Sequence, residues 1–391
     1  MSALSLTNID SVLKPIEEAK GLPNDHYISK AVYEEEKQAL LFHNWAGVDF
    51  GKNVPNTGDA RPIDFMGMPL LIVRDRDGSI GVFQNSCRHR GMILVDKPTK
   101  IRGVISCPYH GWCYSTKGEL RATPHVGGPG VATHKAIKKE ELGLCNVRSY
   151  VWKDIIFVNI SGDAPEFEDY AGTLIKAWKD FDQPMYHGGE NSSFSLEAKT
   201  NWKLAVENYS ESYHLPWIHP ALNTYSKIDD HYNIIKDNVF CGQGTTVYQQ
   251  YQSETGAKFP DFENLANKWD ESAEYVTLFP NVMLGVHRDH FFAIILEPLG
   301  VDLTREHVEL YYAKDAESIP QHHDMIEANS ERWKIVFGED IPVVEGMQKS
   351  RCGQLFDGGR FSPVLDNATH SFHVWVANSL NKKRATEENH V

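Results

Sequence analysis

The chain has 391 residues, 41% of them hydrophobic, and a formal net charge of −14 at pH 7. This length predicts two or three domains that bury their cores without disulfides. The negative charge argues against nucleic acids and anionic membrane surfaces as partners. The sequence contains no run of about 18 apolar residues, so no transmembrane helix is expected. Because the first residues do not follow a secretory pattern, we expect a cytoplasmic protein with reduced cysteines.

The first 160 residues divide into two parts. Residues 9–42 are expected to be helical, and the whole segment 1–42 is expected to pack on the core of the protein. Residues 43–160 are expected to form an all-β domain, because short apolar runs alternate there with turn residues. The expected strands are 69–74, 80–84, 104–107, 111–115, 147–152 and 155–160.

After residue 160 the pattern changes to a mixture of helical and strand-like segments. The expected helices are 166–181, 202–214, 321–336 and 341–351, and the expected strands are 194–198, 239–252, 276–285, 291–297 and 307–312. We therefore predict an α+β protein in which residues 161–391 form a second domain, with an antiparallel sheet flanked by helices. Residues 381–391 are polar and expected to be frayed.

Two Cys-His pairs form the first candidate metal site. Cys87 and His89 lie in one loop, and Cys107 and His110 lie in another. Two thiolates suit one iron of a [2Fe–2S] cluster, and two neutral imidazoles suit the other. Structural zinc is the alternative, but zinc sites of this ligand set usually have closer Cys-Cys and His-His spacings. The cysteines outside these pairs, which we expect to be small buried hydrophobes, are Cys113, Cys145, Cys241 and Cys352.

The surroundings of these four residues resemble a Rieske domain. The elements C-x-H-R-G, at residues 87–91, and C-P-x-H-G-W, at residues 107–112, are similar to those of that family. The resemblance implies a Rieske [2Fe–2S] cluster that accepts one electron at a time. The flanking residues also argue against a chance occurrence of the four candidate ligands.

A second candidate metal site lies in the stretch NWKLAVENYSESYHLPWIH. Glu211 and His214 are three residues apart, so on a helix they would share one face. Pro216 disfavours continuation of that helix, and a break there would bring His219 back beside His214. Two histidines placed in this way form the nitrogen half of a 2-His-1-carboxylate site for ferrous iron.

The local pattern leaves the carboxylate of this site open. Asp340 stands where a helix would begin, which favours an N-cap role. However, the stretch that contains both histidines resembles the catalytic segment of Rieske non-haem iron oxygenase large subunits. In that family an E-D-x₄-E-x₂-Q element supplies an Asp as the third iron ligand. The resemblance therefore implies His214, His219 and Asp340 as ligands of a mononuclear Fe(II), with Glu345 as the alternative carboxylate.

The same resemblance gives Glu211 a role without direct contact to iron. In the family, a carboxylate at this position hydrogen-bonds a ligand histidine, here His214, and a Rieske histidine of the neighbouring chain, here His110. Glu at this position is shared with the carnitine, choline and betaine branch, whereas most members acting on aromatic rings have Asp. A solvated acid on a helix surface is the alternative for Glu211. Asn208, close by, is also expected to be catalytic.

The substrate pocket is expected beside the mononuclear iron. The residues that flank the ligands in sequence are the candidates to line it: Tyr209, Tyr213 and Leu215. Three further aromatic residues lie on strands that could face it: Phe279, Phe291 and Phe292. Aromatic rings can hold a quaternary ammonium group by cation–π attraction. For any single one of them an ordinary core position is the better explanation.

Together these features predict a terminal oxygenase component. It would use O₂ to hydroxylate a small organic substrate, by monooxygenation or oxidative N-demethylation of a quaternary ammonium or betaine-like compound. The resemblance implies electrons from NAD(P)H through a flavin or iron–sulfur reductase, and a homotrimer. The alternatives are dihydroxylation of an aromatic ring, hydroxylation of an aliphatic chain, a Rieske electron carrier and a zinc-stabilised binding module. The length of the chain and the second pair of histidines argue against the alternative that the protein is only an electron carrier.

Overall fold

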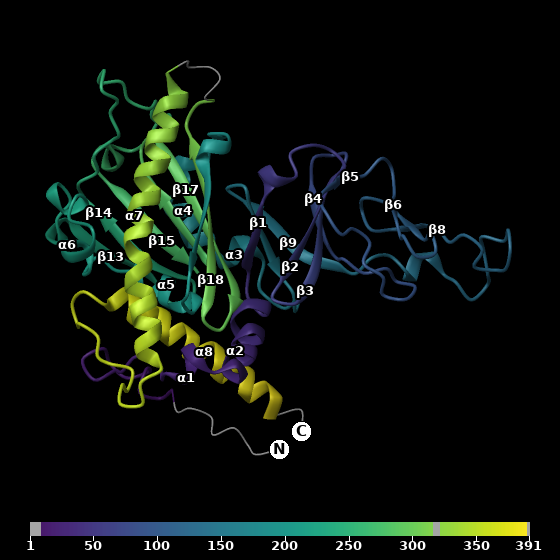
Figure 1. Cartoon of the computed structure of the whole chain (residues 1–391), viewed down its shortest axis with the longest axis horizontal. Helices are drawn as coiled ribbons and strands as arrows, with labels where there is room; N and C mark the ends of the chain where they lie inside the picture. The colour runs from purple at the N-terminus through teal and green to yellow at the C-terminus, as the bar shows by residue number, and fades with distance from the viewer. Residues whose placement is uncertain (1–8, 316–320, 389–391) are drawn as a thin grey trace. The chain divides into compact units, whose positions relative to one another are not determined.

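The protein is described by a computed structural model that covers residues 9–315 and 321–388. The chain forms two compact units (Figure 1). The smaller unit spans residues 47–163, and the larger unit combines residues 1–46 with residues 164–391. The N-terminal segment is therefore part of the larger unit, although the first eight residues of the predicted segment lie outside the described residues.

The smaller unit contains a seven-stranded sheet and a three-stranded sheet. The strand order is β1-β10-β9-β4-β3-β2-β5 in the first and β6-β7-β8 in the second. The strands are β1 (Ala46–Phe50), β2 (Asp59–Phe65), β3 (Met68–Arg74), β4 (Ile80–Gln84), β5 (Thr99–Lys100), β6 (Ile105–Ser106), β7 (Cys113–Tyr114), β8 (Leu120–Ala122), β9 (Asn146–Trp152) and β10 (Ile155–Asn159). All six predicted strands are present, and β1, β2, β5 and β8 add to them.

Two-residue turns join neighbouring strands of the larger of these sheets. Met66 and Gly67 connect β2 to β3, and Lys153 and Asp154 connect β9 to β10. All four residues have positive φ angles, between 50° and 86°. Two successive residues of this kind are typical of a type I′ turn, whose twist matches that of the strands it joins.

The core of the smaller unit packs around two of the candidate ligands. Cys87 and Cys107 are only 3% and 4% exposed. The core side chains around them include Leu71, Val73, Phe83, Ile105, Trp112, Tyr114 and Leu144. His89 and His110 are exposed, so each ligand loop has its first residue in the core and its histidine at the surface.

The larger unit is built on an eight-stranded antiparallel sheet. The strand order is β11-β18-β17-β16-β15-β14-β13, and β12 also pairs with β18. The strands are β11 (Tyr186–His187), β12 (Ser193–Ala198), β13 (His231–Lys236), β14 (Phe240–Thr245), β15 (Ala273–Leu278), β16 (Val282–Val286), β17 (His290–Gly300) and β18 (Leu303–Tyr312). The segment 276–285 is two strands rather than one, because the chain reverses at residues 279–281.

Helices flank this sheet, and the longest of them, α7, runs across one face (Figure 1). The α-helices are α1 (Asp25–Ile28), α2 (Lys30–Glu36), α3 (Phe167–Tyr170), α4 (Gly172–Ala177), α5 (Trp202–Tyr209), α6 (Leu215–Ile218), α7 (His322–Arg351) and α8 (Asn367–Glu388). A π-helical turn, η1 (Lys37–Phe42), continues α2. The two units together confirm the predicted α+β class. Among the described residues, no helix combines the length and apolar character needed to cross a bilayer.

Helix α7 is continuous where the sequence predicts two helices. Pro342 lies inside it, although proline removes one backbone hydrogen bond from a helix interior. Phe337 and Val344, on either side of this point, are buried, so packing holds the helix together across the proline. Asp340 therefore lies within a helix, and the N-cap role expected from the local pattern is wrong.

The two ends of the chain also differ from expectation. Residues 9–24 form turns rather than a helix, and α-helical structure begins at Asp25. At the other end, α8 continues to residue 388, so fraying of residues 381–388 is a wrong prediction, and residues 389–391 lie outside the described residues. The expected burial of the remaining cysteines holds for Cys241 and is wrong for Cys145 and Cys352, which are exposed.

Candidate metal centres

Two loops of the same form carry the first candidate site. Each starts at a cysteine, Cys87 or Cys107, whose N–H donates to the carbonyl five residues further on. The glycine four residues after the cysteine, Gly91 or Gly111, donates its N–H back to the cysteine carbonyl. These glycines have φ angles of +73° and +67°, a conformation that costs little only for glycine. The repeated motif in the sequence is therefore one loop conformation used twice.

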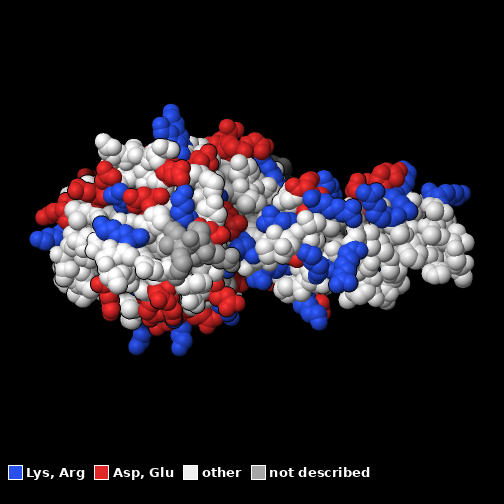
Figure 2. Space-filling view, turned by 90° about the horizontal axis from the view of Figure 1, so that it is seen from above, with Lys and Arg blue, Asp and Glu red and all other residues white. Residues whose placement is uncertain are grey.

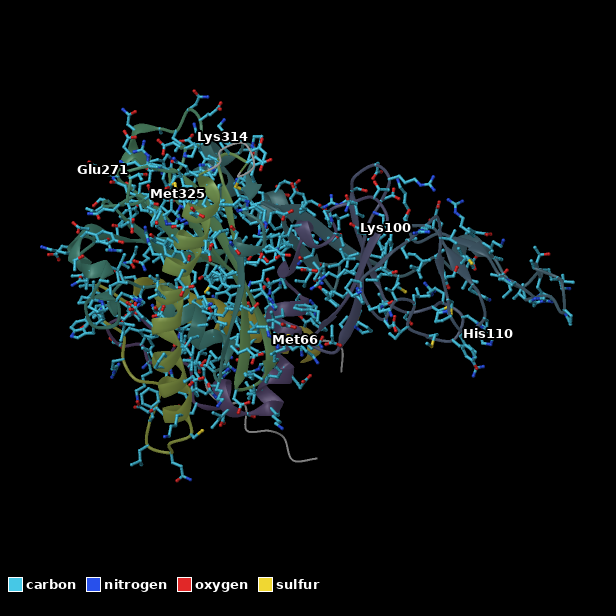
Figure 3. All side chains as sticks on the ribbon, turned by 45° about the horizontal axis from the view of Figure 1, so that its top comes forward. Met66, Lys100, His110, Glu271, Lys314 and Met325 are labelled. Carbon is cyan, nitrogen blue, oxygen red and sulfur yellow. The ribbon has the colours of Figure 1, made fainter. Side chains whose placement is uncertain are left out.

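The side chains of these loops divide into a buried sulfur half and an exposed imidazole half. The Tyr114 hydroxyl lies 3.2 Å from Sγ of Cys87, and burial raises the pKa of the Cys87 thiol. The ring centroids of His89 and His110 are 4.7 Å apart, and Figure 3 shows His110 near the edge of the smaller unit. Two sheltered thiols beside two accessible imidazoles fit a [2Fe–2S] cluster with one sulfur-bound and one imidazole-bound iron.

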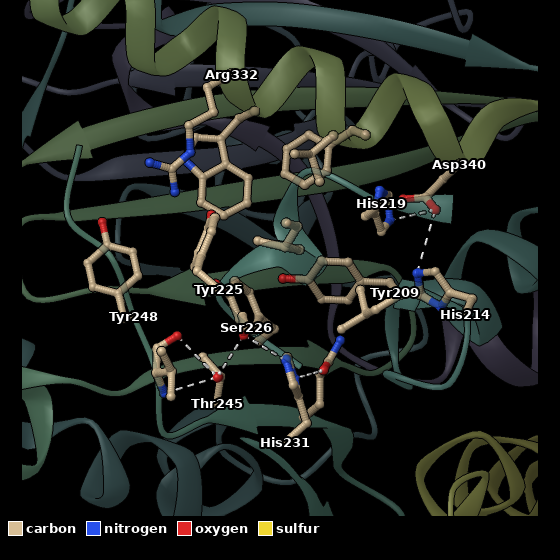
Figure 4. A pocket seen from close by; sticks show the side chains of 18 of the residues that line it. Tyr209, His214, His219, Tyr225, Ser226, His231, Thr245, Tyr248, Arg332 and Asp340 are labelled. Atoms are coloured by element: carbon tan, nitrogen blue, oxygen red, sulfur yellow. Dashed lines mark hydrogen bonds and ion pairs between the residues drawn. The ribbon is translucent and has the colours of Figure 1, made fainter. Parts of the chain in front are cut away.

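The second candidate site lies in the larger unit. His214, His219 and Asp340 place one ligand atom each within 4.8 Å of one another. Oδ1 of Asp340 is 3.1 Å from Nε2 of His219 and 3.7 Å from Nε2 of His214 (Figure 4). Ligand atoms at about 2.1 Å from one metal ion lie about 3 to 3.5 Å apart, so these positions fit a 2-His-1-carboxylate site for iron.

A carboxylate also holds the other nitrogen of each imidazole. Oε1 of Glu211 lies 2.6 Å from Nδ1 of His214, and Oε2 of Glu339 lies 2.7 Å from Nδ1 of His219. A carboxylate that accepts the Nδ1–H bond leaves the lone pair of Nε2 free for a metal ion. Each ring is therefore held through Nδ1 by a carboxylate outside the candidate ligand set, with Nε2 on the side of Asp340.

A hydrogen bond to Asp340 and the charges around His219 further affect the candidate ligands. Asn208, near the end of α5, donates its Nδ2–H to Oδ1 of Asp340 at 3.1 Å and so orients this carboxylate. Burial lowers the pKa of His219, but the carboxylates of Asp340 and Glu339 outweigh burial and raise it overall. The same negative charges that stabilise a proton on this ring also favour a metal cation in its place.

A turn, rather than a helix face, brings Glu211 to His214. Helix α5 ends at Tyr209, and the Glu211 carboxylate accepts hydrogen bonds from the backbone N–H groups of Tyr213 and His214. The chain then enters α6, where Pro216 lies in the first turn and its missing N–H costs nothing. The helix break thus occurs before His214 and not at the proline. The two histidines lie together as expected, with ring centroids 5.2 Å apart.

The acids of α7 have separate roles. Glu345, the alternative iron ligand, accepts a hydrogen bond from the Lys199 N–H at 2.9 Å and does not belong to the group of ligand atoms. Glu339, to which sequence reasoning assigns no role, holds His219. No local pattern separates these residues, because Glu339 and Glu345 are both polar positions of one helix. Only their contacts with distant segments distinguish them.

A pocket walled mainly by aromatic side chains adjoins the three ligands (Figure 4). Its lining comprises Tyr209, His214, Leu215, His219, Leu222, Tyr225, Ser226, His231, Gln243, Thr245, Val247, Tyr248, Tyr275, Phe292, Arg332, Trp333, Val336, Phe337 and Asp340. The cavity volume is ≈ 60 Å³, which suits a small and slender molecule. The ligands lie at one end of the pocket in Figure 4, and Arg332 and Tyr248 lie toward the other.

Some of the residues that the sequence predicts for the pocket line it, and others lie elsewhere. Tyr209, Leu215 and Phe292 line the pocket. Tyr213 does not: it is 41% exposed and packs against Trp217, with ring centroids 5.9 Å apart. Two of the phenylalanines proposed from the strands belong to other parts of the core. They are Phe279, which packs against Trp375, and Phe291, which packs against Tyr311.

Comparison with known proteins places these features in a family. Residues 44–139 match the model of the Rieske [2Fe-2S] domain, and residues 185–382 match that of the ring hydroxylating alpha subunit (catalytic domain). Putrescine 2-hydroxylase of Ralstonia nicotianae is 24% identical over 390 residues, covering 95% of this chain and 98% of that protein. The carnitine monooxygenase oxygenase subunit of Acinetobacter pittii is 26% identical over 350 residues, covering 86% of each.

A solved structure of a quaternary ammonium Rieske monooxygenase has the same fold. The TM-score is 0.74 at 23% identity, over 96% of this chain and 99% of that chain. The two matching domains imply a Rieske cluster and a mononuclear iron as cofactors, and an oxidoreductase that reacts with O₂. Because the catalytic-domain match covers slightly more than half of the sequence, the chain belongs to the ring-hydroxylating alpha subunits, the Rieske-type non-haem iron oxygenases.

Proposed function

We propose that this protein is the terminal oxygenase component of a multi-protein system and hydroxylates a small organic substrate with O₂. The observation that carries this proposal is the position of His214, His219 and Asp340 at one end of an aromatic-walled pocket. A site with three protein ligands leaves metal positions open, and the adjoining pocket holds a substrate within reach of them.

In this proposal His214, His219 and Asp340 hold Fe(II), which supplies the activation of O₂ when it is bound. The surrounding residues position these ligands. Glu211 and Glu339 keep both imidazoles in the tautomer that offers Nε2, and Asn208 orients the carboxylate. Tyr209, Leu215 and the other rings of the pocket orient the substrate and exclude water from it.

We propose that the four residues of the smaller unit bind the Rieske cluster. They are Cys87, His89, Cys107 and His110. A separate reductase with a flavin or an iron–sulfur centre supplies the electrons from NAD(P)H. The exposure of both histidines supports this role, because a partner protein can approach the imidazole half of the site directly.

The charge distribution supports assembly into a head-to-tail homotrimer. Residues 47–163 contain 16 Lys and Arg against 11 Asp and Glu, a net charge of +5, and the remaining residues contain 23 against 42, a net charge of −19. Figure 2 shows blue side chains prominent on the smaller unit and red ones on the larger unit. Opposite charges favour docking of the smaller unit of one chain on the larger unit of the next, in a closed ring.

In such a ring Glu211 is the proposed link between the two metal sites. Its side chain is 14% exposed and already contacts His214. Glu211 and His214 also border an open hollow, separate from the substrate pocket, whose lining includes Asn208 and Arg360. A neighbouring chain's His110 that reaches this hollow can donate a hydrogen bond to Glu211, which then connects the two imidazoles.

We propose a small quaternary ammonium compound as the substrate. By their names, one relative acts on carnitine, another hydroxylates the amine putrescine, and the structural neighbour acts on quaternary ammonium compounds. The aromatic pocket supports this choice, because ring faces attract cations. Oxidation of an N-methyl group consumes O₂, two electrons and two protons and yields an N-hydroxymethyl group and water. The N-hydroxymethyl compound then loses formaldehyde and a proton and leaves a tertiary amine.

The test uses anaerobically purified protein with three irons per chain, a reductase and NADH. Substrate-dependent O₂ uptake and formaldehyde are measured with a panel of trimethylammonium compounds. Asp340→Ala is expected to keep the Rieske electron-spin-resonance signal and two irons, but to lose the third iron and all product. The matched control is Glu345→Ala, in the same helix, which should keep three irons. Product formation by Asp340→Ala contradicts the proposed site.

Dihydroxylation of an aromatic ring is the second candidate function. The aromatic lining of the pocket favours it, since an apolar ring packs well against Phe292, Trp333 and Phe337. The same assay distinguishes the two reactions. A cis-diol formed without formaldehyde identifies ring dihydroxylation, whereas formaldehyde with a secondary or tertiary amine product identifies N-demethylation.

A further inference from the structure

One charged side chain of the substrate pocket has no part in holding iron. This is Arg332, on the face of α7 that is turned to the pocket. The pocket-lining residues of α7 are Arg332, Trp333, Val336, Phe337 and Asp340. Their spacing of one, three or four residues places them along one side of the helix. Arg332 and Asp340 are eight residues apart, so their backbones are about 12 Å apart at 1.5 Å per residue.

The charge of Arg332 lacks a carboxylate partner within residues 9–315 and 321–388. Over these ranges no Asp or Glu oxygen lies within 4.0 Å of its guanidinium nitrogens. The contact that Arg332 does make is with the Trp333 ring, at 5.4 Å from Cζ to the ring centroid. A partly buried guanidinium in an aromatic-walled pocket has lost water without gaining an anion, so it favours an anionic ligand.

The buried carboxylate of Asp289 has partners other than Arg332. Asp289 is fully buried, and its Oδ1 accepts a hydrogen bond from the Tyr248 hydroxyl at 2.9 Å. Nδ1 of His290 lies 2.8 Å from the same oxygen. Asp289 does not line the pocket. Both contacts are made by Oδ1, and the buried Oδ2 has no hydrogen-bond partner among the described residues. Neither oxygen forms an ion pair with Arg332, so within this part of the chain the guanidinium stays available to a ligand.

Asp340 is the one carboxylate among the pocket-lining residues, and its Oδ1 faces His214 and His219. A cationic group in this pocket therefore has aromatic faces to lie against but no acid to pair with. A carboxylate, in contrast, can accept two parallel N–H bonds from the planar guanidinium of Arg332. The pocket is thus chemically different at its two ends, with a metal-ligand set at one and a single cation at the other.

We propose that Arg332 binds a carboxylate group of the substrate. The substrate then lies along α7, with its carboxylate at Arg332 and its oxidised carbon beside His214, His219 and Asp340. This inference rests on the proposed function, in which the same pocket holds the substrate. The preferred substrates are small carboxylates, and among quaternary ammonium compounds they are betaines, whose ammonium group lies against the rings between the two ends. Alcohols and diamines that lack a carboxylate are poor substrates.

The test compares acids with neutral molecules of the same shape. The probes are 4-(trimethylammonio)butanoate and 3-phenylpropanoate, each with its primary amide. Anaerobic calorimetry on the iron-loaded protein measures binding, and O₂ uptake with reductase and NADH measures turnover. The wild-type protein is expected to favour the acid over the amide in at least one pair by about 10- to 100-fold, as for a paired and partly desolvated charge.

Arg332→Gln is expected to abolish this preference while leaving binding of the amide within about twofold, because only the charged contact is removed. Lys334→Gln is the matched control. Lys334 lies two residues further along α7, is 51% exposed and pairs with Glu331 at 4.0 Å. This control should retain the preference. Iron content, the Rieske spin-resonance signal and the melting temperature verify that both variants are folded and loaded.

Two results overturn the carboxylate assignment: a wild-type protein that binds each amide as tightly as its acid, or an Arg332→Gln variant that keeps the preference. The turnover assay separates this inference from the proposed function. Arg332-dependent binding of acids without O₂ uptake or product supports the assignment and contradicts the proposed function. Oxidation of the probes with no dependence on Arg332 supports the function and contradicts the assignment.

Discussion

Two adjacent residues of α7, Glu339 and Asp340, contact opposite nitrogens of one imidazole. Oε2 of Glu339 lies 2.7 Å from Nδ1 of His219, and Oδ1 of Asp340 lies 3.1 Å from Nε2 of the same ring. Two neighbouring residues of one helix therefore hold one nitrogen of the imidazole and place a candidate metal ligand beside the other nitrogen. Because the two carboxylates act on a single ring, the geometry of the site depends on the position of α7 over the sheet.

Glu339→Gln is expected to weaken binding of the mononuclear iron by about 10- to 100-fold, the usual effect of losing a carboxylate partner of a ligand histidine. The amide keeps the size of the side chain but removes the charge that supports Nδ1–H donation. Iron retained after dialysis against a graded series of chelator concentrations measures the change. Glu345→Gln is the control, since Glu345 bonds the Lys199 N–H instead. Equal iron retention by the two variants would contradict the role given to Glu339.

Glu211→Gln is expected to slow product formation by about 10- to 100-fold while both metal sites stay loaded. The reason is that the variant keeps the turn at Tyr213 and His214 but loses the negative charge through which Glu211 is proposed to link His214 to a neighbouring chain. Single-turnover experiments with a prereduced cluster measure the rate of cluster oxidation. Glu211→Asp, which restores the charge on a shorter side chain, should recover part of this rate. A normal rate for Glu211→Gln would exclude the linking role.

Glu306 is expected to make the stability of the protein depend on pH. It is 7% exposed on β18, and burial, with a smaller contribution from the Asp340 carboxylate, raises its pKa from 4.5 to about 8. Between these values the folded protein keeps a proton that the unfolded chain releases. Stability therefore falls as pH rises through this window, by up to about 1.4 kcal/mol per pH unit.

Glu306→Gln removes this ionisation, so the variant is expected to melt at a higher temperature than the wild type at pH 8 and at a similar temperature at pH 5. Scanning calorimetry at both pH values measures the difference. Glu271→Gln, at an exposed position, should leave the pH dependence of the melting temperature unchanged. The prediction is wrong if the advantage of Glu306→Gln is the same at pH 5 and pH 8.

A buried ion pair attaches the N-terminal segment to the rest of the larger unit. Nζ of Lys203 lies 2.5 Å from Oε2 of Glu36, and both side chains are fully buried. Lys203→Met leaves the buried Glu36 with His26 as its remaining partner, at 2.8 Å, and is expected to cost about 3 to 5 kcal/mol of unfolding free energy. The double variant Lys203→Met with Glu36→Gln should recover much of this loss, because neither charge then remains buried. Urea denaturation measures both values, and equal destabilisation of the single and double variants would argue against the pair.

Much of the fold is predictable from short-range patterns. Alternating apolar runs and turn residues predict most strands of the smaller unit, including the strand pair that is joined at Lys153 and Asp154. Long-range packing decides the exceptions. Pro342 locally favours a helix end, but burial of Phe337 and Val344 keeps α7 continuous. The chain reversal at 279–281, within an apolar segment, divides what looks like a single strand.

For the site, the sequence by itself determined the type and spacing of the donors, since each Cys-His pair and the two histidines lie close together in the chain. Only the tertiary structure decided which residues of α7 meet them. Glu339 and His219 are 120 positions apart, and a carboxylate that contacts an imidazole looks in sequence like any other acid on a helix. The same holds for Arg332, which becomes a candidate for substrate binding only because α7 packs with that side over the pocket. The donor atoms of a local motif are set by neighbouring residues in the sequence, whereas the contacts of a helix face depend on how the whole chain packs.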